Sequence, residues 1–586
     1  MEGRGRTPHR PRAPRARSGR VAGGLLLAGA LVLAWVSAAR AQDPARTATI
    51  YVHGFERSGA DQHGTFGEDV GDALLDSIAT LAGVAVADGN AVLPPSVAAM
   101  TDYYGDTPPS YYTPADLAEL DQVTAQWGGG VPRYALIVAK YAHDLMRRSG
   151  AQQVNFVSAS FGSLIVRWLI EKNVGGLAGG GRIARWLSIE GLLAGNWAAS
   201  RGKLVDIVDF VSPLPIDVDH MTYGWVETNV HTPRTEADHA FYAGILMGQA
   251  VSTDDGYENG ALTALMRTSG EWQPNDGVQA AADALFQSVT TRSRFQGMPP
   301  TLGVFHCQHL AIQQARAAWA EAATFLTQRR RVTVTMTSAR VTDLHEPEAW
   351  YWDWRPAEVV LESRVYSPEV EARWGIGDAL CVREKEGAAA PLRRYGQDGE
   401  SQSFTHVLFD DLVLAGEKEL RLELHAEEID YDWRYGVHET VQLPYYDDLG
   451  SGSIRVSTLS PGSYTFQAAS WSCTLAVSIF DYAFAPPLGV VDAPPGRAAL
   501  RISPNPLGAS ARITLEGAAA GTGSAAATLE IHDISGRRVR RIEGDALAGF
   551  RWDGRDQEGV RLPPGLYVVR LSTPRGTWSA RSVLLP

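Results

Sequence analysis

The hydrophobic pattern of the chain changes its period once, near Arg331, and this change constrains the fold more than any other feature. Between Ala48 and Arg329, short apolar runs alternate with segments in which apolar residues recur every three or four positions. Such alternation is typical of a mostly parallel sheet with helices on both faces. From Val332 to Thr337, apolar and polar residues alternate one by one, which predicts half-buried antiparallel strands. We therefore expect a doubly wound α/β fold first and a β-sandwich after it.

Several segments of the first region can be assigned to elements of secondary structure. Apolar residues four positions apart predict a helix from Tyr134 to Arg148, which Gly150 would end. Short apolar runs predict buried strands at Val154 to Val157, at Ile183 to Ile189 and at Thr301 to Phe305. Strands and helices that alternate in this way support the α/β assignment.

The length of the chain, 586 residues, favours several domains, because a single hydrophobic core does not grow to that size. Residues 1–41 have the composition of a targeting segment. After them we predict an α/β domain at 42–330 and a β-sandwich domain at 331–488. A linker with proline and glycine at 489–496 would then lead to a last β-rich domain at 497–586.

The first 41 residues are predicted to be a secretory signal peptide. Seven arginines between Arg4 and Arg20 precede an apolar run from Val21 to Ala38, and Ala39-Arg40-Ala41 supplies the small residues of a cleavage site. A single membrane anchor is the alternative, because about 18 apolar residues can span a bilayer. The cleavage site and the lack of a basic stop-transfer flank favour the signal peptide. We expect an exported bacterial protein, secreted or at the cell surface, with no transmembrane segment after cleavage.

Charge and cysteine content bear on the partners and on the bonds of the chain. The formal net charge of −13 argues against nucleic acid as a partner, because phosphate binding requires a basic surface. The three cysteines lack the C-x-x-C spacing of metal and redox sites. Cys381 and Cys473 both fall in the predicted β-sandwich and could pair, which would leave Cys307 free. The sequence leaves that pairing open.

Ser160 is the candidate nucleophile. It stands in Ser158-Ala159-Ser160-Phe161-Gly162, between the strand predicted at Val154 to Val157 and a predicted helix. A nucleophile elbow has this context, with the serine on a sharp turn and small residues on both sides of it. The backbone N–H of Phe161, at the start of the helix, would face the developing oxyanion. Ser158 stands where the usual G-x-S-x-G has its first glycine, and a serine-rich turn is the alternative interpretation.

A second oxyanion donor is predicted upstream of this turn. His53, Gly54 and Phe55 follow a short buried strand at Thr49 to Val52, about a hundred residues before Ser160. Gly54 allows the chain to turn, so that the backbone N–H of Phe55 can face the nucleophile. We therefore expect His53, Gly54 and Gly162 to support the site.

Asp276 is the candidate acid. It lies in Asn275-Asp276-Gly277-Val278, before the strand that begins at Thr301, and it would hold the imidazole of a histidine base in the productive tautomer. An Asx turn is the alternative role of this sequence. Asp254 and Asp255 are the reserve candidates.

His309 is the candidate general base, which would take the proton from Ser160. It follows the strand that ends at Phe305, and we expect Leu310 to pack inward and hold the loop. His306 is the competing base, directly after that strand. The order serine, acid, histidine is the order that an α/β-hydrolase requires.

Through these motifs, residues 46–329 resemble the α/β-hydrolase lipases and esterases. The run from Leu164 to Leu169, the early His-Gly, the Asn-Asp-Gly-Val and the His-Leu all have counterparts in bacterial lipases. One strand end departs from the family, because Ile189-Glu190-Gly191-Leu192 stands where lipases carry Thr-Pro-His. Two insertions, Ala85 to Gly130 and Leu193 to Gln249, are candidates for a lid or an acyl pocket.

The resemblance implies an α/β-hydrolase fold and the hydrolysis of an ester or lipid substrate through an acyl-serine, without metal or organic cofactor. An acyltransferase or a polyester depolymerase would use the same residues. A cell-surface binding protein that keeps only the scaffold is the alternative from another class.

The last domain resembles the Ig-like domain of flagellar hook-capping proteins and the C-terminal sorting domains of type IX secretion cargo. The resemblance is carried by Ser503-Pro504-Asn505-Pro506, by the run from Leu529 to Val539 and by Pro564-Gly565-Leu566-Tyr567. It implies an Ig-like β-sandwich that contacts secretion machinery or the cell surface. A passive stalk is the alternative.

Two acidic groups of the middle domain, Asp343 to Glu346 and Asp430 to Asp432, are candidates for a structural calcium ion, because hard oxygen ligands suit it. Solvated acidic loops are the alternative. The aromatic run Trp350 to Trp354 is a candidate contact for carbohydrate or lipid, or part of the core.

Overall fold

A computed structural model describes the chain in two compact units, which divide between Pro486 and Pro487. It describes residues 43–55, 73–87, 92–200, 215–230, 241–242, 244–254, 274–286, 299–344, 357–383, 392–430, 445–482, 499–503, 507, 510–516, 526–532, 538–545, 549–563, 565–573 and 576–584. The predicted signal peptide and linker lie outside these residues, as do Glu346, Asp432 and the aromatic run Trp350 to Trp354.

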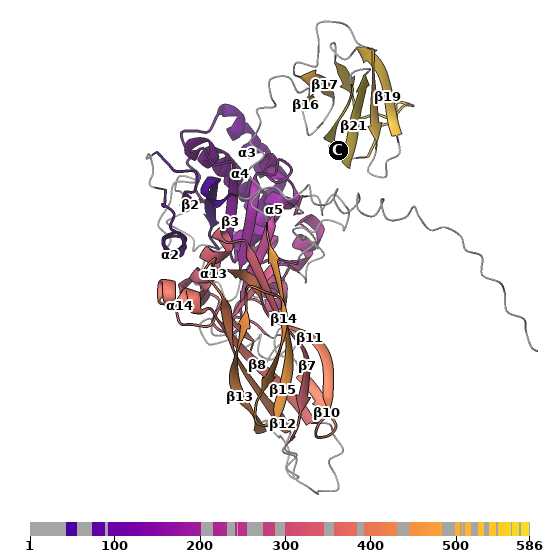
Figure 1. The fold of residues 1–586 in the computed structure, drawn as a ribbon. Coiled ribbons are helices and arrows are strands. Elements are labelled where there is room, and N and C mark those ends of the chain that lie inside the picture. The colour runs from indigo at the N-terminus through magenta and orange to yellow at the C-terminus, as the bar shows by residue number, and fades with distance from the viewer. Residues whose placement is uncertain are drawn as a thin grey trace, which may run out of the picture. The chain divides into compact units, whose positions relative to one another are not determined.

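The first unit is built on a sheet whose first six strands are all parallel. Their order in space is β2-β1-β3-β4-β5-β6. Figure 1 labels β2 and β3 of this sheet. The predicted mostly parallel sheet is therefore confirmed, and the strands predicted at Ile183 to Ile189 and Thr301 to Phe305 have the bounds expected. The six strands are β1 (Thr47–Val52), β2 (Ala98–Met100), β3 (Gln153–Ala159), β4 (Ile183–Ile189), β5 (Leu246–Ser252) and β6 (Thr301–Phe305).

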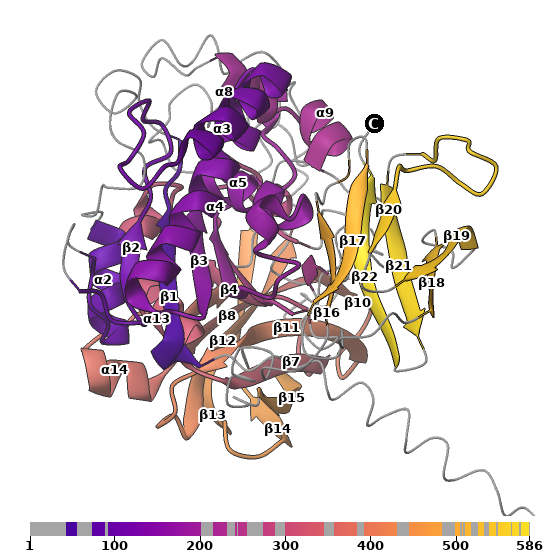
Figure 2. The same cartoon turned by 90° about the horizontal axis from the view of Figure 1, so that it is seen from above.

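Helices cover both faces of this sheet. Successive strand residues point to opposite sides, and apolar residues on both sides must be buried. Tyr51 and Val157 belong to one hydrophobic core, with α2 (Ala73–Ala82) and α13 (Arg316–Thr327). Their neighbours Ile50 and Phe156 belong to a second core, which contains buried residues of the other three long helices. These are α3 (Pro114–Trp127), α4 (Gly130–Ser149) and α5 (Phe161–Glu171), drawn in Figure 2.

The helix predicted from Tyr134 to Arg148 is confirmed as part of α4, which ends where the sequence indicates. Gly150 adopts a φ of 72° and donates its N–H to the carbonyl of Met146, as a left-handed C-cap does. The shorter elements are η2 (Pro44–Arg46), η4 (Val174–Gly176), α6 (Trp197–Ser200), α8 (Pro215–His220), α9 (Tyr223–Trp225), η6 (Val226–Val230), α12 (Ala281–Ala284), η9 (Ala311–Gln314) and α14 (Pro368–Trp374).

The residues predicted to form a β-sandwich domain of their own continue the same sheet. β11 pairs antiparallel with β6, with Asp410 opposite Leu302, and the order beyond β6 is β11-β7-β15-β14. The edge of β6 is therefore covered rather than left to pair with another chain. These strands are β7 (Arg330–Val341), β11 (Ser401–Val413), β14 (Gly462–Gln467) and β15 (Trp471–Asp481).

A second antiparallel sheet shares the core of this half. Its order is β10-β8-β12-β13, with β9 paired to β8. Its buried residues, among them Val365 and Leu422, lie in one cluster with those of β7 and α13. The change of period near Arg331 thus marks the passage from parallel to antiparallel pairing inside one compact unit. The strands are β8 (Ala357–Tyr366), β9 (Cys381–Arg383), β10 (Leu392–Tyr395), β12 (Glu419–Asp430) and β13 (Tyr445–Ser457).

The pairing considered for Cys381 and Cys473 is wrong, because both residues are free thiols. Cys473 is in register with Ala339 on β7. Cys381 is close enough to Asp411 for their charges to interact, and Asp411 is in register with Val332. Val332 and Ala339 are about 23 Å apart along the strand, at about 3.3 Å per residue. A disulfide requires Cα atoms within about 7 Å.

The second unit consists of two antiparallel sheets around one core, in which Leu529, Trp552 and Val569 are fully buried. Among the described residues of the whole chain, no helix has the length and apolar character needed to cross a membrane. The strands of this unit are β16 (Ala499–Ser503), β17 (Ala511–Glu516), β18 (Ala526–His532), β19 (Arg538–Asp545), β20 (Phe550–Trp552), β21 (Gly565–Thr573) and β22 (Gly576–Leu584).

Candidate active site

Ser160 occupies the sharp turn between β3 and α5. Its φ of 49° and ψ of −123° are strained for a residue with a side chain. The N–H of Ser160 donates to the carbonyl of Ile189 at 3.0 Å, which ties the turn to β4. The helix begins with the next residue, Phe161. This is the strand-turn-helix geometry expected of a nucleophile elbow.

Gly162 is required by the closeness of the first strand to this helix. A Cβ atom at Gly162 would lie 2.2 Å from the carbonyl oxygen of His53 and 2.3 Å from that of Val52. Ser158 has contacts of its own, because its hydroxyl accepts a hydrogen bond from the indole N–H of Trp186 at 2.8 Å. The Ser158 hydroxyl also lies 3.0 Å from that of Ser163. The serine at the first position of the motif therefore does more than fill the place of a glycine.

Three side chains form a hydrogen-bonded row at this turn. The Nε2 atom of His309 lies 3.0 Å from Oγ of Ser160, and its Nδ1 atom lies 2.7 Å from Oδ2 of Asp276. All three residues are nearly buried, with exposed fractions of 9% or less. The candidates that the sequence places on three separate loops thus meet in the order that a serine nucleophile, a base and an acid require.

Asp276 makes contacts that fit both of the roles that the sequence left as alternatives. Its Oδ1 atom accepts the N–H groups of Val278 and Gln279, at 3.0 and 2.7 Å, as in an Asx turn. Its Oδ2 atom faces His309, whose own N–H donates to the backbone carbonyl of Asp276. The turn therefore fixes the carboxylate that orients the imidazole.

The competing candidates lie elsewhere. His306 is exposed just after β6, whereas His309 is the histidine that contacts Ser160. Asp254 donates its N–H to the carbonyl of Cys307 at 3.1 Å, and Asp255 lies outside the described residues. The inward packing expected of Leu310 is wrong, because 57% of that residue is exposed.

The end of β1 passes directly beside the nucleophile. A Cβ atom at Gly54 would lie 3.1 Å from the Cβ of Ser160, so the chain approaches as closely as a glycine allows. The rings of Phe55 and Phe161 meet edge to face with 6.1 Å between their centroids. Of the two residues suggested as oxyanion donors, Phe161 thus follows Ser160 directly and Phe55 lies against Phe161.

Tyr103 holds this loop, and the sequence analysis did not single it out. Its hydroxyl lies 2.9 Å from the carbonyl oxygen of His53 and 2.8 Å from that of Gly54. Its ring stacks on the imidazole of His53 with 4.3 Å between the centroids. Tyr103 is fully buried and comes from the first of the two insertions. The aromatic composition of that insertion was the one available signal.

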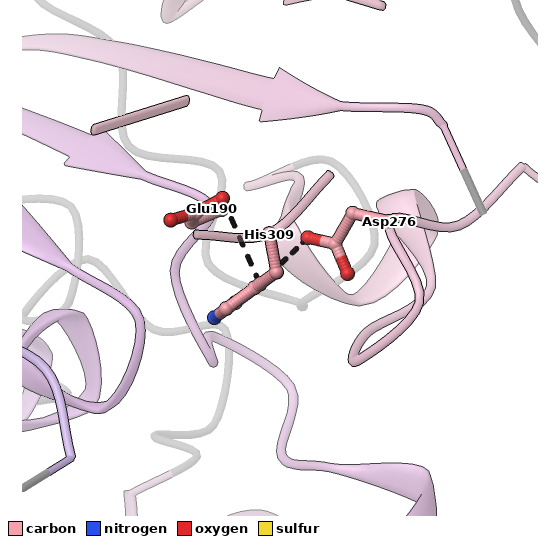
Figure 3. Close-up of side chains that lie close together, drawn as sticks. All are labelled: Glu190, Asp276 and His309. Atoms are coloured by element: carbon pink, nitrogen blue, oxygen red, sulfur yellow. Dashed lines mark hydrogen bonds and ion pairs between the residues drawn. The ribbon is translucent and has the colours of Figure 1, made fainter. Parts of the chain in front are cut away.

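Glu190 is the second residue that the sequence did not assign to the site. It directly follows β4, and its Oε2 atom lies 3.6 Å from Nδ1 of His309 (Figure 3). Glu190, Asp276 and His309 offer ligand atoms within 4.8 Å of one another, the spacing of a metal site. The imidazole, however, already bonds Asp276, as in a hydrogen-bonded relay.

The charges of the two carboxylates raise the pKa of the His309 imidazole. Burial lowers the pKa of His309, but the charges of Asp276 and Glu190 outweigh that effect and raise it from the ordinary 6.5 to about 9. Burial also raises the pKa of Glu190 to about 8, although the charge of His309 opposes this. The site therefore favours a protonated imidazole more strongly than a single acid would.

Comparison with known proteins finds one family model that is similar to part of the last domain. Residues 508–576 match the family model of the FlgD Ig-like domain. The chain is thus similar to flagellar hook-capping proteins over this segment. A comparison with curated proteins gives no match.

The search of solved structures returns several enzymes that act on esters or lipids. A mature lipase of Bacillus licheniformis is 14% identical, with 49% of this chain and 94% of that chain covered and a TM-score of 0.32. A metagenomic carboxyl esterase is 14% identical, with 48% and 74% covered and a TM-score of 0.28. A phospholipase of Legionella pneumophila is 12% identical, with 69% and 89% covered and a TM-score of 0.29. At such scores the fold and the site rest on the geometry described above.

Proposed function

We propose that the protein is a serine ester hydrolase, a lipase or carboxylesterase that acts through an acyl-enzyme on Ser160. The observation that carries the proposal is the hydrogen-bonded row of Ser160, His309 and Asp276 at a strained strand-to-helix turn. A structural role alone does not account for a serine at positive φ that faces a buried histidine backed by a carboxylate.

Acylation would begin with proton transfer from Oγ of Ser160 to Nε2 of His309, as Oγ attacks the ester carbonyl carbon. Asp276 stabilises the imidazolium that forms. The N–H groups of Phe55 and Phe161 donate to the oxyanion. When the tetrahedral intermediate breaks down, His309 returns the proton to the leaving alcohol, and the acyl group stays on Ser160.

Deacylation would repeat these steps with water in place of the serine. His309 takes a proton from water, the hydroxide attacks the acyl carbon, and Ser160 leaves with the proton from His309. The proposed reaction uses side chains and backbone of this chain alone, and it requires no metal or organic cofactor. If an alcohol replaces water, the same site is an acyltransferase.

A fluorophosphonate probe tests the proposal, because it labels only an activated serine. We expect wild-type protein to be labelled on Ser160, and Ser160→Ala to take up no label. Ser163→Ala is the matched control and should still be labelled. Ser163 is a buried serine in the first turn of α5, and its hydroxyl lies beside those of Ser158 and Ser188. A folded wild-type protein without label would contradict the proposal and favour a binding protein on a hydrolase scaffold.

We also propose that the protein is exported and that its second unit contacts secretion machinery or the cell surface. The arginine-rich, apolar start of the chain supports export, and the match of residues 508–576 to the FlgD Ig-like domain supports an extracellular assembly role. Expression with and without residues 497–586, followed by assay of medium and cells, tests this. Equal release and equal surface retention of both forms would contradict it.

A further inference from the structure

Glu190 has an unusual backbone for a buried, charged residue. It lies directly after β4 with a φ of 42°, a conformation that favours glycine or asparagine. Only 1% of the residue is exposed. Its N–H donates to the carbonyl of Ala250 at 2.7 Å, so the strained conformation is held between two strands. Strain and burial together at a strand end suggest that this side chain has a function.

The side chain of Glu190 lies beside the base and shares a neighbour with the acid. Its Oε2 atom lies 3.6 Å from Nδ1 of His309, less than 1 Å farther than the Oδ2 atom of Asp276. The hydroxyl of Ser252 lies 3.1 Å from each of those two carboxylate oxygens. The amide of Gln313 lies 3.5 Å from the other oxygen of Glu190. Because Ser252 has one proton to donate, it bonds one carboxylate at a time.

We propose that Glu190 is a second carboxylate for His309, a positioning residue that bonds Nδ1 in place of Asp276 when the charge of Asp276 is removed. This inference rests on the proposed function of Ser160, His309 and Asp276. In the intact protein, Asp276 is the nearer partner of Nδ1, and the hydroxyl of Ser252 lies within hydrogen-bond distance of both carboxylates. Figure 3 shows the two carboxylates on either side of the ring.

The electrostatics of the pair make the exchange feasible. Burial first, and the charge of Asp276 in addition, raise the pKa of Glu190, whereas the charge of His309 lowers it. An Asp276→Asn substitution removes the repulsion, so Glu190 ionises more readily and becomes the anionic partner of the imidazolium. The charged groups that act on Glu190 among the described residues are His309 and Asp276, and Ser252 and Gln313 are its neutral partners.

A double-mutant cycle tests the exchange. The enzymes are wild type, Glu190→Gln, Asp276→Asn and the double variant, compared by kcat/KM for a nitrophenyl ester per folded molecule. We expect Glu190→Gln alone to lower kcat/KM less than about tenfold, and Asp276→Asn alone less than about 100-fold. In the Asp276→Asn background, Glu190→Gln should cost a further ~100-fold, because no carboxylate then faces Nδ1.

Glu321→Gln is the matched control. Glu321 is a buried glutamate on α13 whose pKa burial and Asp411 raise well above the usual range, so glutamine closely replaces its neutral form. It should change kcat/KM by the same factor in both backgrounds. If Glu190→Gln prevents folding, Glu190→Asn removes the carboxylate with a residue that tolerates positive φ.

The pH dependence of kcat/KM is the second measurement. The charge of Glu190 helps to raise the pKa of His309, so Glu190→Gln should move the acidic limb of the profile to lower pH, and Glu321→Gln should not. The inference is overturned if Glu190→Gln costs the same factor with and without Asp276, or if the limb stays in place. Full activity of Ser160→Ala would instead overturn the proposed function itself, so the two failures are distinguishable.

Discussion

The parallel and antiparallel halves of the large sheet use their buried polar groups differently. In the parallel half, β3, β4 and β6 end at the same edge, where they are followed by Ser160, Glu190 and His309. In the antiparallel half, strand ends alternate between the two edges. Its buried ion pair, Arg331 with Asp410, joins β7 to β11. Parallel strands gather side chains at one point, where they can react, whereas antiparallel strands leave them to hold neighbouring strands together.

The largest expected effect separates two histidines at the parallel edge. His309→Ala should lower kcat about 10⁶-fold, as loss of a base from a triad does, and it should add little to Ser160→Ala. His306→Ala should change kcat less than about tenfold, because His306 is exposed after β6. Initial rates on nitrophenyl esters at equal folded fraction give both numbers. A near-normal His309→Ala beside an inactive His306→Ala would reverse the assignment.

The pH profile of the wild-type enzyme tests how strongly the two carboxylates at the parallel edge act on His309. The proposed base must be neutral, and the carboxylates raise the pKa of His309 to about 9. Protonation of His309 removes the base, so kcat/KM is lost as the pH falls through about 9. Well below pH 9 it should drop about tenfold per pH unit, which gives roughly a 500-fold fall from pH 9 to pH 6. A midpoint at the ordinary value of 6.5 or below would contradict the influence of the two carboxylates.

The sequence predicts the parallel edge well, because its signals are local. A serine at a strand-to-helix turn and a histidine after a strand can be recognised from a few neighbouring residues, and the structure brings both to one point with Asp276. The sequence marks Glu190 only as part of a strand end that differs from the lipases, because a single acid between Ile189 and Gly191 has no periodic or turn signal. Its meaning depends on His309, more than a hundred residues away.

The antiparallel half was harder to predict, because strand pairing is a long-range choice. The alternation of Val332 to Thr337 indicates a strand correctly, as part of β7. Alternation does not say which strand lies beside it. The single register pair of Asp410 with Leu302 decides that the sheet is continuous across the predicted boundary at residue 330. The exposure of Leu310 likewise could not be predicted from the His-Leu motif, because it depends on the path of the loop.

Arg331→Met tests whether the buried ion pair of the antiparallel half contributes to stability alone. The guanidinium of Arg331 is buried and bonds both carboxylate oxygens of Asp410, at 2.7 and 2.6 Å. Removal of one partner leaves a buried charge unpaired, which typically costs about 3–5 kcal/mol of stability. We expect a large fall in the free energy of unfolding in urea, with kcat per folded molecule unchanged. Loss of activity at full stability would mean that this half also acts in the reaction.

Tyr103→Phe should give the smallest of these effects, and it should change only the reaction at the parallel edge. The substitution keeps the ring that stacks on His53 and removes the hydroxyl that bonds the carbonyls of His53 and Gly54. The loop that carries the N–H of Phe55 then loses a buried hydrogen bond, worth about 1 kcal/mol, and its donor is less well placed for the oxyanion. Because the proposed donor would act in the transition state, we expect kcat to fall about tenfold while KM changes little. The matched control is Tyr395→Phe, a buried tyrosine of β10 that should leave kcat unchanged. An equal fall in both variants would make Tyr103 a residue of stability only, and an unchanged kcat in Tyr103→Phe would remove the loop of His53 to Phe55 from the oxyanion site.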